Sequence, residues 1–226
     1  MNKNTNLFIV KLLFFTVLFI ISTETQAQSG CPVIRENIDF SVKVIPKNIN
    51  YILNAKQNQL TRLAGNRLKR RSNQRVLGLT LTQQSISAKM RGKTKQISPG
   101  IFCTRITSVG IKITVLKIDV YVLGKYPRGS CQYKAILDHE HEHVATYQSG
   151  LGELEREFNN KLWSVIRNLS AGVGPTSKTS SNAAFRIMKK EIAAIQLPIE
   201  QKMKSRDRQI DTPLSYKVLT QQCTTW

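Results

Sequence analysis

All three histidines of the 226-residue chain lie within five positions, in the stretch His139-Glu140-His141-Glu142-His143. On an α-helix, residues four apart lie on the same side, about 6 Å apart along the axis. Two imidazoles placed in this way can bind one Zn²⁺ ion. Glu140 would stand beside that ion, where its carboxylate can take a proton from zinc-bound water. The spacing therefore predicts His139 and His143 as zinc ligands and Glu140 as the catalytic residue.

A third ligand is needed to complete such a site, and it is not histidine, since no other histidine remains. Several glutamates follow closely, and among them Glu155 lies nearest to the apolar stripe of its predicted helix. If that helix is continuous from His143, however, Glu155 lies about 18 Å further along the axis. The C-terminal segment offers Asp211 and Tyr216 instead. The sequence leaves Asp211 and Glu155 as the two tentative third ligands.

The elements that must position these residues are predicted from hydrophobic periodicity. Alternating apolar residues indicate strands at 38–44, 77–81 and 109–122, the last with a phase shift at Leu116. Helical spacing is found at 48–71, at 131–148 after a cap at Ser130, at 151–169, and from 183 to about 209 with a bend or interruption at Pro198. Strands first and helices second predict an α+β fold, with an N-terminal, mostly antiparallel sheet followed by long C-terminal helices that carry the histidines.

The N-terminus and the cysteines predict an exported protein. Residues 1–27 combine lysines, a short apolar run and small residues before the expected cleavage point, which is typical of a signal peptide. No other segment is apolar enough to cross a membrane, so we expect no transmembrane segment after cleavage. The four cysteines, Cys31, Cys103, Cys131 and Cys223, then predict two disulfides with three possible pairings. We favour Cys131–Cys223 with Cys31–Cys103, in a periplasmic or extracellular protein.

The net charge of +20 is concentrated in one part of the chain. Residues 40–118 contain 16 lysines and arginines and no acid, whereas residues 119–226 contain 15 bases and 11 acids. Such a region produces a positive potential that attracts anionic partners. Outside the cytoplasm, anionic envelope polymers are the partners we expect. Export and the scarcity of aromatic residues in this region argue against nucleic acid.

Residues 76–216 resemble a family of uncharacterised bacterial secreted proteins predicted to be zinc-dependent proteases. The resemblance is carried by Cys103 followed by the alternating region to Val122, by Pro127, and by His139-Glu140-x-x-His143 within a long helix. It implies a zincin-like fold for residues 28–226 as a single domain, with a β-rich half at 28–128 and a helical half at 129–226. Members of the family end in a stretch like Tyr-Asp-x-x-Thr-x-His-Gly, for which the nearest counterpart here is Ile210-Asp211 without a histidine.

These features together predict a secreted or periplasmic zinc-dependent metallopeptidase. Its peptide or protein substrate would lie as an added strand on the edge of the sheet formed by residues 101–122. An alternative is a non-enzymatic exported module whose basic region binds envelope polymers, with the HEHEH stretch a structural or adventitious metal site. A third possibility is a zinc or copper scavenger that uses this stretch.

Overall fold

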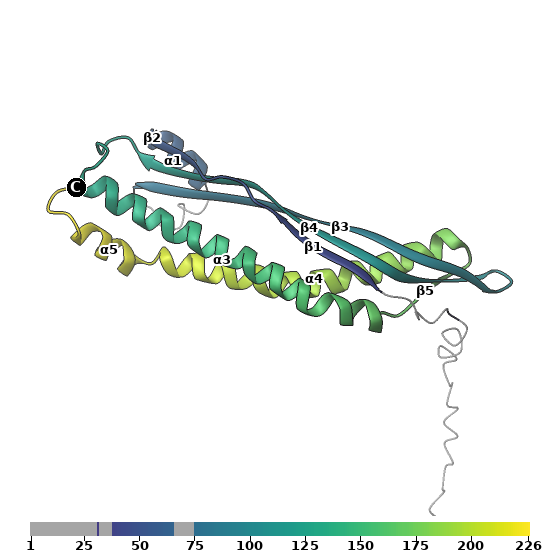
Figure 1. Cartoon of the computed structure of the whole chain (residues 1–226). Coiled ribbons are helices and arrows are strands. Elements are labelled where there is room, and N and C mark those ends of the chain that lie inside the picture. The colour runs from purple at the N-terminus through teal and green to yellow at the C-terminus, as the bar shows by residue number, and fades with distance from the viewer. Residues whose placement is uncertain (1–30, 32–37, 66–74) are drawn as a thin grey trace, which may run out of the picture.

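The structure, a computed structural model, describes Cys31 and residues 38–65 and 75–226. The signal peptide predicted at 1–27 lies outside the described residues. Along the chain the elements are β1 (Asp39–Ile45), β2 (Asn50–Ala55), α1 (Gln57–Ala64), β3 (Gly78–Ser98), β4 (Ile101–Leu123), α3 (Cys131–Asn168), β5 (Gly172–Gly174), α4 (Ser177–Ile210) and α5 (Pro213–Gln221). The α+β class is confirmed, since a sheet formed by the first half is followed by long helices (Figure 1).

The sheet is built around β4 and is mixed, so the expectation of a mostly antiparallel sheet is wrong. β1 and β2 both pair parallel with β4, whereas β3 and β5 pair antiparallel with it. β3 accompanies β4 along nearly its whole length, so β1, β2 and β5 follow one another along the opposite edge of β4. The alternation of apolar residues fixes which face of a strand is buried, but it carries no information about strand direction. Among the described residues β3 therefore forms one edge of the sheet.

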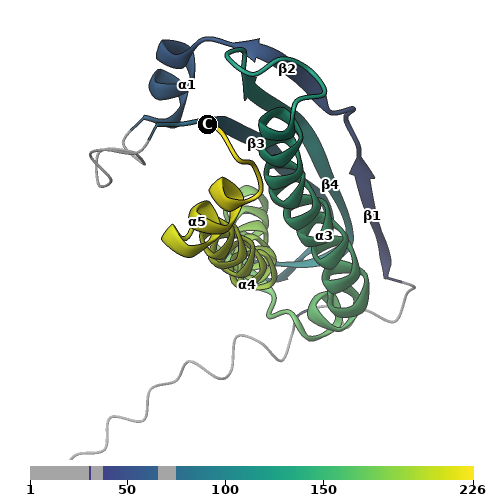
Figure 2. The ribbon, with the colours of Figure 1, turned by 90° about the vertical axis from the view of Figure 1, so that its left-hand side faces the viewer.

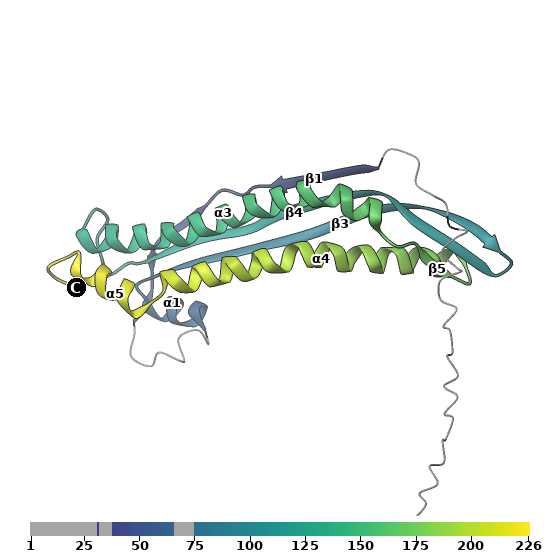
Figure 3. The same ribbon diagram turned by 90° about the horizontal axis from the view of Figure 1, so that it is seen from below.

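The helices α3 and α4 cover one face of this sheet (Figures 2 and 3). The core between the two layers contains alternate residues of β4, such as Ile111 and Ile113, and a stripe on α3 that includes Leu154 and Phe158. The α3 stripe repeats every three or four residues, as a helix packed on a sheet requires. The site described below lies at the end of this long core where α3 begins.

The helical predictions are corrected in three places. The two helices expected at 131–148 and 151–169 form the single helix α3, which passes through Gly150 without a break. Gly150 allows α3 to approach α4 closely, because a Cβ there would lie 2.4 Å from Met203 Sδ. α4 begins earlier than expected, at Ser177, and continues through Pro198. Where one helix was expected at 48–71, residues 48–65 contain strand β2 and the short helix α1, and residues 66–71 lie outside the described residues.

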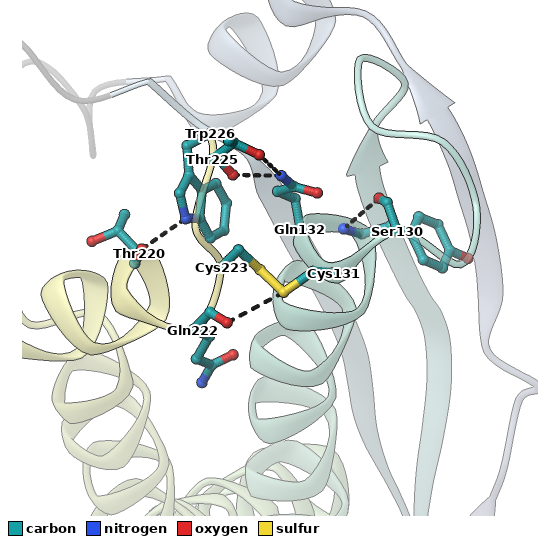
Figure 4. The surroundings of a disulfide bond; sticks show 9 residues. Ser130, Cys131, Gln132, Thr220, Gln222, Cys223, Thr225 and Trp226 are labelled. Atoms are coloured by element: carbon teal, nitrogen blue, oxygen red, sulfur yellow. Dashed lines mark hydrogen bonds between the residues drawn. A yellow bond between two sulfur atoms is a disulfide. The ribbon is translucent and has the colours of Figure 1, made fainter.

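Two disulfides hold the ends of the elements together. Cys31 pairs with Cys103 and Cys131 pairs with Cys223, which is the favoured pairing. Ser130 caps α3 as predicted, since its side chain accepts a hydrogen bond from the backbone N–H of Tyr133. Figure 4 shows that the second disulfide joins the first turn of α3 to the segment after α5. No helix in the described part of the chain has both the length and the apolar character needed to span a membrane.

Candidate metal centre

The two outer histidines lie one turn apart on α3, and both face inward. His139 and His143 are 9% and 8% exposed, and their ring centroids are 5.2 Å apart. Ser130 fixes the start of α3, and buried residues such as Ile136 and Val144 fix its rotation against the core. The helical geometry that the spacing predicted is therefore present.

Asp211 completes a group of three potential ligands. Its Oδ1 lies 3.3 Å from Nε2 of His139 and 3.3 Å from Nε2 of His143. One ligand atom from each of the three residues falls within 4.8 Å of the others, so the group could hold a metal ion. Of the two tentative third ligands, the structure brings Asp211 to the histidines.

The turn between α4 and α5 presents Asp211 to α3. α4 ends at Ile210, and Thr212 begins α5 with a capping box to Ser215, so the chain changes direction at Asp211. The Tyr216 hydroxyl of α5 donates a hydrogen bond of 2.7 Å to Asp211 Oδ1. Tyr216, the other C-terminal candidate, thus contacts the group through Asp211, and its ring also lies beside that of His139.

Glu155 and His141 lie outside this group. Glu155 follows His143 by twelve residues on the continuous helix α3, which places it about 18 Å along the axis. As a third ligand it is therefore ruled out by the continuity of α3. The His141 ring makes an edge contact with Tyr51 of β2, whose hydroxyl lies 3.1 Å from His141 Nε2.

Asp207 supports the site and was missed in the sequence. Its Oδ1 accepts a hydrogen bond of 2.7 Å from Nδ1 of His143. This contact fixes the proton on Nδ1 and leaves Nε2, which faces Asp211, as the ligand atom. A signal was present, since Asp207 precedes Asp211 by four residues in an otherwise basic helical segment.

Glu140 lies beside the histidines with its side chain almost completely buried. It is 4% exposed, and its Oε2 accepts a 2.8 Å hydrogen bond from the hydroxyl of Thr80 on β3. Burial has the largest effect on the pKa of Glu140 and raises it to about 7, although His143 and the Thr80 hydrogen bond act to lower it. A carboxyl group with this pKa can both accept and release a proton near neutrality.

The strand β3 passes close beside Glu140 of α3, a contact that the sequence did not predict. A Cβ on Gly78 would lie 2.5 Å from Glu140 Oε1 and 2.7 Å from Cγ2 of Ile136. Only a residue without a side chain allows β3 and α3 to approach this closely. Gly78 and Thr80 carried no recognisable signal in the sequence, because their role depends on how β3 is placed against α3.

The charges around the three ligands fit a bound cation. Burial alone would raise the pKa of Asp211, but hydrogen bonds from His139, His143 and Tyr216 hold it well below its ordinary value. Burial alone would lower the pKa of His143, but hydrogen bonds to Asp207 and Asp211 raise it to about 10. The carboxylates thus attract positive charge to this point. Two imidazole nitrogens and a carboxylate oxygen are a donor set that Zn²⁺ accepts.

Two adjacent cavities open along β3, and the ligand group lines the first of them. One has a volume of about 380 Å³ and is lined by all three ligands, Glu140 and apolar side chains that include Leu77 and Leu79. The other has a volume of about 330 Å³ and continues along residues 80–84 of β3. His143, Thr80 and Asp207 line both cavities. The strand at 101–122, expected to offer the edge, is β4, which is paired on both sides, so the edge beside the site belongs to β3.

Comparisons with family models, with curated proteins and with solved structures find no match for this chain.

Proposed function

We propose that this protein is an exported, zinc-dependent metallopeptidase with a zincin-like arrangement of strand and helix at its site. The observation that carries the proposal is that Asp211, 72 residues after His139, lies against the histidine pair from another helix. The sequence motif predicts two ligands and a neighbouring glutamate. The carboxylate oxygen of Asp211 supports this set as a third donor, and Glu140 lines the same cavity as all three residues.

His139, His143 and Asp211 would hold the metal, and Asp207 would orient His143. Zn²⁺ bound by three protein ligands keeps an open position, lowers the pKa of water to about 7 and polarises a carbonyl group. Glu140 would accept a proton from the attacking water and pass it to the amine that leaves the cleaved peptide bond.

The substrate would bind in an extended conformation along the edge of β3 that pairs with no other described strand. An added strand gains backbone hydrogen bonds from such an edge, while pockets beside it accept alternate side chains. The two cavities lie along residues 76–84, which lead into β3 and form its first part. The larger one presents Leu77, Leu79 and Ile136, so it favours an apolar side chain next to the cleaved bond.

The test compares three variants of the purified protein by zinc content, urea unfolding and hydrolysis of a mixed peptide library. Glu140→Gln should retain one zinc ion per chain and the fold but lose hydrolysis by about 10²–10⁴-fold, because the proton acceptor is removed. His143→Ala should lose the zinc. Glu155→Gln, the matched control on the same helix, should change neither property.

Hydrolysis by Glu140→Gln at the wild-type rate would refute the role of Glu140. Tightly bound zinc in a wild-type protein that cleaves no peptide would refute the peptidase and favour a structural metal site. Iron as the bound metal would instead indicate an oxygenase, which can use the same donor types.

A further inference from the structure

The face of the sheet that points away from α3 and α4 carries positive side chains in adjacent strands. Inner and outer faces are distinguished by burial along β4, where Ile111 and Ile113 belong to the core and Lys112 between them is exposed. The strand register then assigns the partners of Lys112 to the outer face as well.

Lys43 of β1 and Ser87 of β3 both pair with Lys112, so two lysines lie side by side in one cross-strand row. In the next row along the sheet, Ser41 and Lys89 flank Gly110. The row beyond it contains Asp39, Ser108 and Arg91. We call the four exposed bases Lys43, Lys89, Arg91 and Lys112 the outer basic face.

Within the described part of the chain, this face keeps most of its positive charge. None of its four bases forms an ion pair with a described residue, and Asp39, the one carboxylate in these rows, accepts a hydrogen bond from Ser108. Like charges placed directly opposite each other destabilise a sheet by a few tenths of a kcal/mol to about 1 kcal/mol. The opposed pair Lys43 and Lys112 is therefore a cost to the sheet that an anionic ligand would relieve.

The helical layer carries charges of both signs. Residues 119–226 contain 15 bases and 11 acids, and several of these acids form ion pairs, such as Glu153 with Lys202. Residues 40–118, which supply most of the sheet, contain 16 bases and no acid. Among the described residues, most acids therefore lie in or next to the helices, and the strands carry mainly bases.

We propose that the outer basic face binds a linear polyanion that carries phosphate or sulfate groups. The residues between the bases are small and polar, so extended Lys and Arg side chains can lie along the sheet and reach successive anionic groups. Neighbouring strands lie about 4.8 Å apart, and successive rows lie about 6.8 Å apart along each strand, so the four bases are spaced like the groups of an extended polyanion.

A linear polymer fits this face better than a bilayer or a nucleic acid. A long sheet twists, and a flexible chain can follow that twist whereas a flat membrane surface cannot. The rows named above contain no apolar or aromatic side chain on the outer side, so nothing would insert into a membrane or stack on bases. The polymer would leave the metal centre free, because α3 lies on the other face.

The experiment measures binding of long-chain inorganic polyphosphate to the purified protein between 50 and 200 mM salt. Each base that contacts a phosphate releases a counterion from the polymer. Four such contacts predict that affinity falls roughly 50-fold over this range, by analogy with single-stranded nucleic acid. The double variant Lys89→Glu, Lys112→Glu should bind at least tenfold more weakly at low salt. The control Lys189→Glu, Lys190→Glu changes the net charge equally on exposed positions of α4 and should stay within threefold of wild type.

Equal weakening by both double variants would refute the proposal, since the attraction would then depend on net charge alone. Binding to vesicles of anionic lipid but not to polyphosphate would also overturn it. Glu140→Gln and metal chelation should leave polyphosphate binding unchanged, so this inference and the proposed peptidase activity can fail separately.

Discussion

Replacing Gly78 by alanine tests how closely β3 approaches the candidate site. The new Cβ would lie 2.5 Å from Glu140 Oε1, 2.9 Å from Glu140 Cγ and 2.7 Å from Ile136 Cγ2. Ordinary contacts to a Cβ begin near 3.4 Å, so these atoms must move by up to about 1 Å. Ile136 is 1% exposed and packed on all sides. Most of the displacement must therefore fall on Glu140 or on the spacing between β3 and α3.

The size of the effect follows from two opposing contributions. Overfilling a packed region reduces stability by about 1–3 kcal/mol. Replacing glycine by alanine also lowers the conformational entropy of the unfolded chain, which offsets about 0.4–1 kcal/mol of this loss of stability. We expect Gly78→Ala to lower the free energy of unfolding by about 1–2 kcal/mol. A catalytic group displaced by about 1 Å can lose about 10²-fold in rate, and we expect hydrolysis to fall by at least that factor.

Urea unfolding and peptide hydrolysis measure the two effects. Gly152→Ala is the matched control, because a Cβ there meets only Arg156 Nη1 at 3.6 Å within α3. It should leave hydrolysis unchanged and stabilise the protein by about 0.5–1 kcal/mol, since alanine favours helix over glycine. If Gly78→Ala were as stable and as active as wild type, the close contact between Gly78 and Glu140 would be refuted.

Four further changes test the site and its supports. Asp207→Asn should weaken zinc binding by about 10–100-fold in a chelator competition, and an unchanged affinity would remove Asp207 from the support of His143. Asp211→Ala should purify without stoichiometric zinc; full occupancy would point to another third ligand. Joint replacement of Cys131 and Cys223 by serine should lower the free energy of unfolding by about 2–5 kcal/mol, measured in urea, and equal stability would contradict the bond. Leu154→Ala, at a fully buried position, should lower it by about 2–5 kcal/mol, and a change below 1 kcal/mol would contradict its burial.

The parts of the site that could be predicted from the sequence are those determined within one helix. His139, Glu140 and His143 owe their relative positions to helical geometry alone, so their spacing was sufficient. The cap at Ser130 is equally local, since its partner Tyr133 lies three residues away. The apolar alternation of β4 identified the longest inner strand for the same reason.

The parts that could not be predicted depend on how distant segments meet. The parallel pairing of β1 and β2 with β4 follows from chain path, which alternation does not encode. Gly78 and Thr80 support Glu140 only because β3 lies against the first turns of α3. The choice between Asp211 and Glu155 turned on whether α3 is continuous, and the apolar stripe that crosses Gly150 was the signal that favoured continuity.

The antiparallel packing of α3 and α4 explains why Asp207 and Asp211 occupy the site together. Toward the site, the residue numbers of contacting pairs fall along α3 and rise along α4, in matching steps of about one turn. Glu153 pairs with Lys202, and Gly150 lies against Met203. His143 then meets Asp207, and both histidines meet Asp211.

Because each helix presents the same face every three or four residues, one contact in this series fixes the register of the others. Gly150 lacks a side chain and lies against Met203, about two turns from His143. This contact therefore helps to set which α4 residues reach the histidines. The candidate metal centre is the last layer of this helix pair, where α4 ends and the carboxylate of Asp211, which follows it, can turn toward α3. Knowledge that the two helices are antiparallel neighbours, together with one contact between them, would have been enough to place Asp207 and Asp211 from the sequence.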